Sequence, residues 1–169
     1  MRLVVQRVTR AAVRSGGQTL GVIGQGAVVL VGVVAGDTAE LAERMADKLA
    51  GLRYFEDAAG FTNLAVTDAG GALLVVSQFT LAADLRSGRR PGFTDAAPPA
   101  LAEPLVERFM ARLRASGLQV ETGRFGARME LELVNDGPFT LILDSERDLA
   151  AGRDRSGASA GSGNGGSGR

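Results

Sequence analysis

The residues most suited to chemistry stand together as Ser77-Gln78-Phe79-Thr80, directly after the apolar segment 71–76. The composition of that segment is typical of a strand buried on both faces. A buried strand that ends in hydroxyl and amide side chains must satisfy them, because an unpaired buried polar group costs about 1–3 kcal/mol. Ser77 and Thr80 could bond to neighbouring backbone at the strand end, or the run could line a small polar pocket. A second unusual stretch, residues 135–140, favours the pocket.

The composition narrows the chemistry of such a pocket. The chain has no histidine and no cysteine, which excludes Ser-His-Asp triads, Cys-His dyads and the usual zinc sites. The sequence also has no clustered acidic loop of the kind that binds magnesium or calcium. We therefore expect no metal and no cofactor. The base of any reaction would be a carboxylate, a lysine, an activated hydroxyl or a group that the substrate supplies.

The charge distribution gives little overall attraction to nucleic acid. The 19 basic and 19 acidic residues balance, and 45% of the residues are hydrophobic, as in globular proteins. Arg86, Arg89 and Arg90 nevertheless gather in a Gly- and Pro-containing loop just after the polar run. Such a run is usually a solvated face, but here a polyanionic substrate would approach it, so these arginines, together with Arg124, are candidate contacts for such a substrate.

The N-terminal segment and the lack of cysteine indicate where the protein works. Residues 1–7 carry charge within their apolar pattern, which is typical of neither a signal peptide nor a membrane span. The absence of cysteine fits a reducing compartment. We expect a cytoplasmic protein with no membrane association.

A single domain over residues 1–149 is expected to position these groups, with a disordered Gly- and Ser-rich tail over 150–169. The patterns predict a mixed α/β (α+β) fold of twisted, mainly antiparallel sheets covered by two helices. The expected strands cover residues 2–15, 19–23, 27–34, 54–55, 63–66, 71–76, 118–121, 129–133 and 139–143.

Both expected helices are amphipathic. The first begins at Asp37-Thr38-Ala39-Glu40, which has the acid-x-x-Glu form of a helix start. The second follows Pro98-Pro99 and stops at Gly117. Their predicted buried faces are Leu41, Met45, Leu49 and Leu52 in the first helix, and Leu101, Leu105, Phe109 and Leu113 in the second.

The stretch Asn135-Asp136-Gly137-Pro138 lies between two expected strands. These residue types together are typical of a plain tight turn. Because an Xaa-Pro bond is cis in only about 5–6% of cases in folded proteins, the residues alone do not indicate a cis peptide.

Taken together, several segments resemble the D-aminoacyl-tRNA deacylase family, also known as D-Tyr-tRNA deacylases of the Gly-cisPro type. The likeness spans roughly residues 1–145. The segments that carry it are Gln6-Arg7-Val8, Gly24-Gln25-Gly26, Val75-Val76-Ser77-Gln78-Phe79-Thr80-Leu81, Arg90-Pro91-Gly92-Phe93, Thr122-Gly123-Arg124-Phe125 and Leu133-Val134-Asn135-Asp136-Gly137-Pro138-Phe139-Thr140. Two long motifs in the right order make the likeness specific.

The resemblance implies a homodimer in which the Gly137–Pro138 peptide is cis and enters the partner's pocket. There the two carbonyls would hold the ammonium of a D-aminoacyl group on the 3′ end of tRNA and leave no room for an L side chain, so that glycine would also be a substrate. In this picture Arg7 braces the loop, Asn135 belongs to the same chiral-selection set, and Ser77, Gln78, Phe79 and Thr80 form the catalytic site.

Two mechanisms follow from the resemblance. In one, the 2′-hydroxyl of the terminal adenosine helps to activate water, and main-chain N–H groups stabilise the oxyanion. In the other, Thr80 is a covalent nucleophile, but the sequence offers it no candidate base.

The chain departs from the family pattern at two positions. Phe139 stands where valine is more common, and Gly92 stands where serine is common; either change could alter the pocket or tRNA affinity. Two alternatives stay open. One is a non-catalytic homodimer that binds RNA or a small molecule. The other is a related deacylase class with a trans Gly–Pro bond, which Phe79 and Asn135-Asp136 disfavour.

Overall fold

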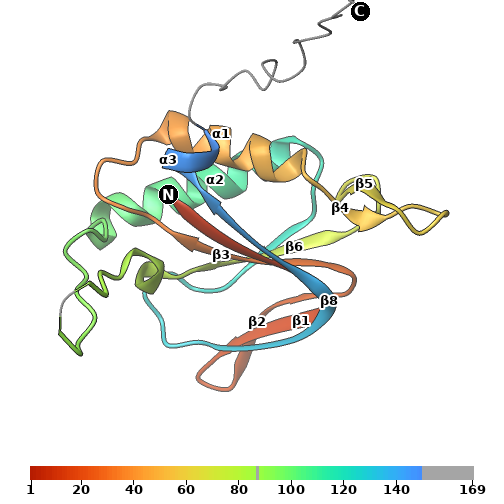
Figure 1. Cartoon of the computed structure of the whole chain (residues 1–169). Coiled ribbons are helices and arrows are strands. Elements are labelled where there is room, and N and C mark those ends of the chain that lie inside the picture. The colour runs from red at the N-terminus through yellow and green to blue at the C-terminus, as the bar shows by residue number, and fades with distance from the viewer. Residues whose placement is uncertain (87, 150–169) are drawn as a thin grey trace, which may run out of the picture.

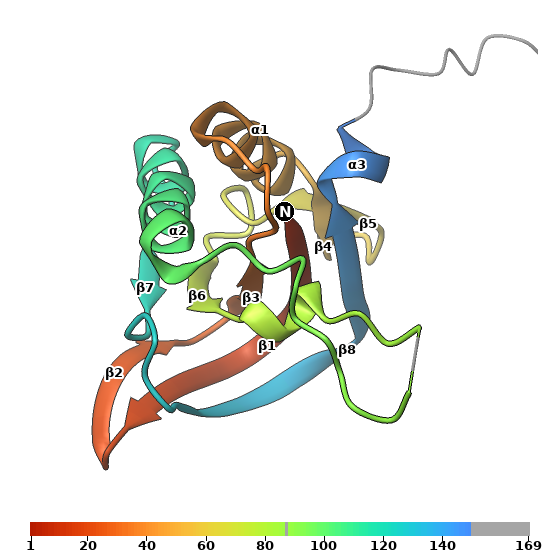
Figure 2. The ribbon, with the colours of Figure 1, turned by 90° about the vertical axis from the view of Figure 1, so that its left-hand side faces the viewer.

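The computed structural model describes residues 1–86 and 88–149, so the predicted tail lies outside the described residues. Its strands are β1 (Arg2–Ser15), β2 (Gln18–Ile23), β3 (Gly26–Gly32), β4 (Arg53–Glu56), β5 (Thr62–Ala65), β6 (Ala72–Ser77), β7 (Val120–Thr122) and β8 (Glu130–Asp144). The helices are α1 (Ala39–Ala50), α2 (Pro99–Ala115), the short α3 (Ser145–Asp148) and the 3₁₀ helix η1 (Phe79–Ala82). This arrangement confirms the predicted mixed α/β fold, with α1 and α2 side by side over one face of a twisted sheet (Figures 1 and 2).

The long strand β1 organises the main sheet. Its first half pairs with β3, its second half pairs with β2, and β8 runs along its other edge, all antiparallel. Beyond β3 the sheet continues as β6 and β7, which pair in parallel. Parallel neighbours need long crossover connections, and these contain α1 between β3 and β6 and α2 between β6 and β7. The sheet is therefore mainly antiparallel, as predicted, with a parallel end.

The first helix starts one residue later than the predicted motif implies. Its N-cap is Thr38, whose hydroxyl accepts the N–H of Leu41 at 3.2 Å. Asp37 instead accepts hydrogen bonds from the Met1 amino group at 2.7 Å and from the Val34 N–H at 2.8 Å. The predicted Met45 and Leu49 are fully buried against the sheet. Among the described residues no helix is long and apolar enough to cross a membrane.

The buried face of α2 agrees only in part with the prediction. The predicted Phe109 and Leu113 are buried, whereas Leu101 is 61% exposed and Leu105 is only partly buried, and Ala102, Val106 and Met110 complete the buried face. A strict four-residue spacing turns by about 40° per step around a helix of 3.6 residues per turn. Residues 101 and 113 therefore cannot share one face, and the packing against α1 and the sheet selects the later residues.

The segment 130–144 overturns the prediction of two strands joined by a tight turn. It is one continuous strand, β8, and both of its halves pair with β1. Gln6 pairs with Thr140 and Val8 pairs with Asn135, so residues 136–139 bulge out opposite the single residue Arg7. The turn-forming residue types are present, but they extend one strand into a bulge and the chain does not reverse there.

Candidate active site

The polar run follows the end of β6, as predicted. The main-chain N–H of Gln78 donates to the carbonyl of Val31 at 2.7 Å, and the chain then enters η1. This turn crosses the end of β3 at Gly32. A Cβ at position 32 would lie 2.7 Å from the Cβ of Leu81 and 3.1 Å from the carbonyl oxygen of Gln78. Only glycine permits so close an approach of η1 to β3.

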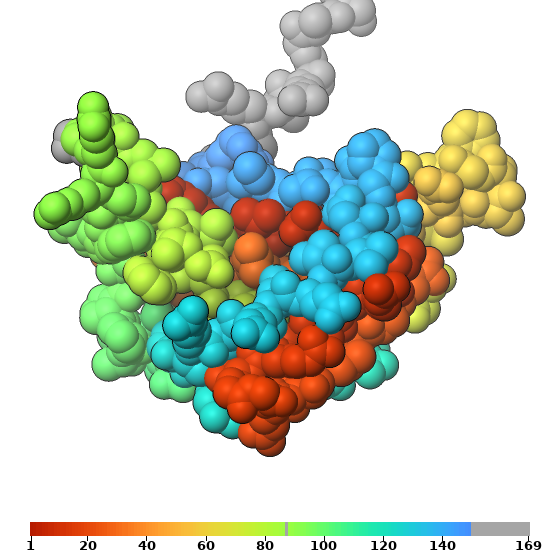
Figure 3. Space-filling view, turned by 90° about the horizontal axis from the view of Figure 1, so that it is seen from below, coloured from red at the N-terminus to blue at the C-terminus, as the bar shows by residue number. Residues whose placement is uncertain are grey.

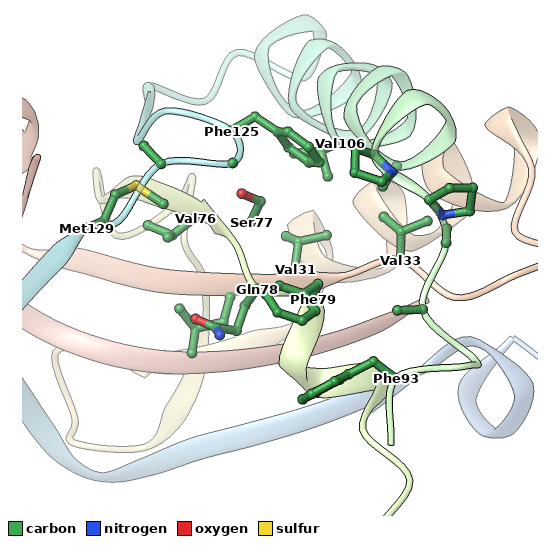
Figure 4. Close-up of a pocket in the computed structure, with 18 of the residues that line it drawn as sticks. Val31, Val33, Val76, Ser77, Gln78, Phe79, Phe93, Val106, Phe125 and Met129 are labelled. Atoms are coloured by element: carbon green, nitrogen blue, oxygen red, sulfur yellow. The ribbon is translucent and has the colours of Figure 1, made fainter. Parts of the chain in front are cut away.

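A cavity of about 660 Å³ opens beside this turn, between the ends of β3 and β6, the start of α2 and the loop before β8 (Figure 4). It is lined by Leu30, Val31, Val33, Val76, Ser77, Gln78, Phe79, Phe93, Ala96, Ala97, Pro98, Pro99, Ala102, Val106, Phe125, Gly126, Ala127, Met129 and Leu131. The walls are apolar, and the polar side chains among them are Ser77 and Gln78. No titratable side chain lines the cavity within the described part of the chain.

The hydrogen bonds of the polar run exclude the interpretation that the Thr80 hydroxyl bonds to neighbouring backbone at the strand end. Its hydroxyl accepts from the side-chain amide of Gln78 and is not bound to neighbouring backbone. The Ser77 side chain points toward the loop that carries Phe125 (Figure 4). Among the described residues, the N–H groups of Phe79 and Thr80 have no hydrogen-bond partner, as is usual for the first N–H groups of a helix. Thr80 itself does not line the cavity.

Two phenylalanines form one rim of the cavity. The rings of Phe79 and Phe93 meet edge to face with centroids 5.1 Å apart, and Phe79 is 59% exposed. Such rings present flat apolar surface to a ligand. Phe93 and the facing Phe125 were missed as site residues by sequence reasoning, although both belong to segments of the family resemblance.

The predicted basic residues lie on the two loops that flank the cavity. Arg86 makes two side-chain bonds of 2.8 Å to the carboxylate of Asp84, and this pairing holds the pKa of Asp84 well below its usual range. Much of the charge of Arg86 is thus already neutralised. Arg89 and Arg90 are exposed on the same loop, and Arg124 is exposed next to Phe125.

A second cluster forms around Arg7, whose side chain is only 4% exposed. Its Nε lies 3.2 Å from the Asp136 carbonyl oxygen and 3.0 Å from the Asp136 carboxylate, and Nη1 donates to the Tyr54 carbonyl at 2.9 Å. Glu56 lies 3.6 Å away, and the guanidinium carbon stands 4.6 Å from the centroid of the Phe139 ring. Arg7 therefore connects the bulge of β8 to β4.

The tip of the bulge faces solvent. The Gly137–Pro138 peptide bond is cis, and both residues are exposed. Asn135 is also exposed, and its side-chain oxygen accepts from the Gln6 amide at 3.4 Å. The structure thus brings the predicted residues Arg7, Asn135, Gly137 and Pro138 together.

Within one chain, this second cluster and the cavity do not meet. Arg7 pairs with Ala27 and Ala27 with Leu73, whereas Ser77 ends β6 four residues further along. Three strand spacings and four residues of rise separate the bulge from Ser77 by about 20 Å in a flat sheet. Seen from below, the β4–β5 hairpin that supports Arg7 and the loop after η1 project on opposite sides (Figure 3). Accordingly, no residue of the Arg7 cluster lines the cavity.

The described residues contain no group of three or more acidic side chains placed to hold a metal ion. The other charged pairs of the domain lie elsewhere, for example those of Arg108 with Glu43 and of Arg112 with Asp47 between α2 and α1. Such exposed pairs contribute little to stability and do not form a site.

Comparison with known proteins gives consistent matches over the whole described domain. The family model "D-Tyr-tRNA(Tyr) deacylase" matches residues 4–144. A D-aminoacyl-tRNA deacylase of Anaeromyxobacter dehalogenans is 60% identical over 147 residues, 87% of this chain and 99% of the relative, and one of Symbiobacterium thermophilum is 58% identical, with 87% and 97% covered.

Solved structures show the same fold. One titled "c-Myc DNA Unwinding Element Binding Protein" matches with a TM-score of 0.80 at 40% identity, covering 85% of this chain and 98% of that one. A second, titled as a probable eukaryotic D-amino acid tRNA deacylase, matches with a TM-score of 0.74 at 18% identity, covering 84% and 97%. At that lower identity the likeness shows the fold alone.

Proposed function

Because the chain belongs to the D-Tyr-tRNA(Tyr) deacylase family, we infer that it is a D-aminoacyl-tRNA deacylase, which hydrolyses the ester bond between a D-amino acid and tRNA. The structural observation that supports this function most directly is the cavity at Ser77-Gln78-Phe79. Its walls are apolar, and none of the described residues that line it has a titratable side chain. An aminoacyl ester is already activated toward water, so a site that positions it and stabilises an oxyanion suffices for catalysis.

In the proposed reaction, water attacks the ester carbonyl carbon to form a tetrahedral oxyanion. The N–H groups of Phe79 and Thr80, which have no partner among the described residues, are available to stabilise that charge. The C–O ester bond then breaks, and the 3′ oxygen of the tRNA leaves with a proton. Because none of the described residues that line the cavity has a titratable side chain to act as a base, we assign activation of the water to the adjacent 2′-hydroxyl of the substrate. Thr80 is the weaker candidate, since its hydroxyl partner is an amide donor.

Chiral selection is proposed to come from the bulge of a second copy of the chain. The exposure of Gly137 and Pro138, and their distance from the cavity of their own chain, support this assignment. In a homodimer the Gly137 and Pro138 carbonyls would accept hydrogen bonds from the substrate ammonium. An L side chain would then clash with the backbone, whereas a D side chain points away and glycine has none. The same geometry makes glycyl-tRNA a substrate.

The exposed arginines beside the cavity are proposed to contact the tRNA 3′ end. Arg89, Arg90 and Arg124 stand on the flanking loops and could bind phosphates, whereas Arg86 is engaged by Asp84. We propose that the enzyme works in the cytoplasm with the translation machinery, where it would remove mischarged D-aminoacyl groups before they reach the ribosome. No metal or cofactor enters the proposed reaction.

The test is the release of amino acid from matched D-Tyr-tRNA, L-Tyr-tRNA and Gly-tRNA by the purified protein. Rapid hydrolysis of the D and glycyl esters, with the L ester spared, is the expected result. If a folded protein that binds tRNA spared all three esters, the alternative of a non-catalytic RNA-binding protein would replace the enzyme.

The cross-subunit site has a separate test in mixed dimers. A Phe79→Ala chain keeps its bulge but damages its cavity, and a Gly137→Val chain keeps its cavity but damages its bulge. In a dimer of one chain of each kind, a shared site would combine the intact cavity with the intact bulge and recover about half of the selective activity. A site contained within one chain would recover none.

A further inference from the structure

We propose that Phe139 is a positioning residue for chiral selection, because its ring holds the guanidinium of Arg7 and thereby sets the orientation of the Gly137–Pro138 tip. This inference rests on the proposed function of the tip. Phe139 is one of the two positions at which the sequence departs from the family pattern, and the inference assigns it a specific physical role.

The side chain of Arg7 joins the two ends of the bulge in β8. Asp136 and Phe139 are the first and last residues of the bulge, with Gly137 and Pro138 between them. Arg7 binds both ends: its Nε lies 3.0 Å from the Asp136 carboxylate, and its guanidinium carbon lies 4.6 Å from the centroid of the Phe139 ring. One buried side chain of β1 therefore closes the base of the bulge, and the tip between the two contacts inherits its orientation.

The aromatic ring has a role that an aliphatic side chain of similar size would lack. A guanidinium group directs its N–H donors outward in its own plane, so its flat faces make no hydrogen bonds. The donors of Arg7 bond to Asp136 and to the Tyr54 carbonyl, and the guanidinium carbon lies over the ring of Phe139. A ring in that position attracts the cation through its quadrupole and keeps water away from it.

The contact with the Phe139 ring gains importance because the carboxylate partner of Arg7 is partly exposed to solvent. The Asp136 side chain is 41% exposed and Glu56 is 57% exposed, so water screens both ion pairs of Arg7. Arg7 itself is 4% exposed. The buried contact of Arg7 is thus the Tyr54 carbonyl, at 2.9 Å, and the partly buried Phe139 ring adds a second contact that does not depend on an exposed carboxylate. The first connects Arg7 to β4, and the second connects the bulge to Arg7.

The test compares Phe139→Leu, which keeps most of the volume but not the ring, with Phe139→Tyr, which keeps the ring. Phe61→Leu is the matched control, since Phe61 is 70% exposed at the tip of the β4–β5 hairpin. Two quantities are measured for each protein: the NMR signal of the Arg7 Nε–H, and the ratio of kcat/KM for D-Tyr-tRNA to that for L-Tyr-tRNA.

In Phe139→Leu we expect the Arg7 signal to lose its ring-current shift and its order, and the D/L ratio to fall about three- to tenfold, which lies between the values for an exposed and a fully desolvated cation–π contact. Phe139→Tyr and Phe61→Leu should keep both quantities. A fall in thermal stability with an unchanged D/L ratio in Phe139→Leu would overturn the proposal, because it would show a structural role only. A D/L ratio that fell equally in Phe139→Tyr would also overturn it.

The NMR measurement and the D/L ratio together distinguish a failure of this inference from a failure of the proposed function. If the wild-type protein hydrolysed no D ester, the proposed function would fail and with it the role in selection. The NMR comparison would still decide whether Phe139 orders Arg7. An unchanged Arg7 signal in Phe139→Leu would overturn the positioning role whatever the activity.

Discussion

Arg7 and Asp136 lie 3.0 Å apart at the larger of the two irregularities in the pairing of β8 with β1. Four residues of β8 stand opposite this single residue of β1. The Arg7 side chain reaches the main chain of the bulge, where the regular hydrogen bonds between the two strands are interrupted. A buried guanidinium needs partners for most of its donors. The bulge supplies a carboxylate, a carbonyl and an aromatic ring, so the irregular backbone and the buried charge depend on one another.

The first prediction concerns this dependence. Arg7→Lys keeps the charge but loses the planar fork that reaches Asp136, Tyr54 and the Phe139 ring together. We expect the free energy of unfolding to fall by about 1–3 kcal/mol, the cost of leaving a buried acceptor such as the Tyr54 carbonyl unpaired. Urea denaturation gives the value. Arg14→Lys on the same strand is the control, since Arg14 is 41% exposed and its pair with Glu132 lies in solvent; equal losses in both variants would contradict the prediction.

The second prediction concerns the turn that shapes the cavity. Gly32→Ala would place a Cβ 2.7 Å from that of Leu81 and push η1 off the end of β3. We expect about 1–3 kcal/mol of destabilisation from overpacking and a loss of deacylation, because Phe79 and Thr80 would move. Gly24→Ala is the control, as nothing lies within 4 Å of its added Cβ. Calorimetry and ester hydrolysis measure the two effects; full activity in Gly32→Ala would show that η1 need not touch Gly32.

The third prediction separates the two mechanisms. Thr80→Val removes the hydroxyl and keeps the shape, and its hydroxyl is bound only to the Gln78 amide. If the substrate 2′-hydroxyl activates water, we expect kcat to change by less than about tenfold, whereas loss of a true nucleophile costs about 10⁴-fold or more. Single-turnover hydrolysis of D-Tyr-tRNA decides between these values. The matching substrate change, a terminal 2′-deoxyadenosine, should abolish turnover.

The fourth prediction concerns Tyr54, the single tyrosine of a chain without tryptophan. Burial raises the pKa of its hydroxyl above the usual value of 10.0, and the hydroxyl has no hydrogen-bond partner among the described residues. The folded state thus holds the proton more tightly than the unfolded state. The resulting stability is complete below pH 10 and decreases as the pH rises from there toward the folded pKa.

Tyr54→Phe should remove this alkaline loss and, at neutral pH, leave stability unchanged or raise it by about 1 kcal/mol, because it deletes an unpaired buried polar group. Absorbance at 295 nm follows tyrosinate directly, since no other tyrosine contributes. We expect no tyrosinate in the wild type near pH 10 until the protein unfolds. A normal titration in the native protein would show that the hydroxyl reaches water.

Much of the site was readable from local pattern. The apolar run of β6 and the polar residues after it follow from composition alone, and the structure places three of the four, Ser77, Gln78 and Phe79, at the cavity. The strand β1 and the helix starts near Thr38 and Pro98 are likewise local, because turn, cap and periodicity signals act within a few residues.

What the sequence determined by itself is therefore the two long helices, most of the strands and the absence of histidine and cysteine chemistry. The tertiary structure alone decided which face α2 buries, that residues 130–144 form one strand, and what surrounds Arg7. Its partners Tyr54 and Asp136 are 47 and 129 residues away in the chain. Strand register and side-chain partners depend on contacts between distant segments, and a local pattern holds no information on which distant segment will supply them.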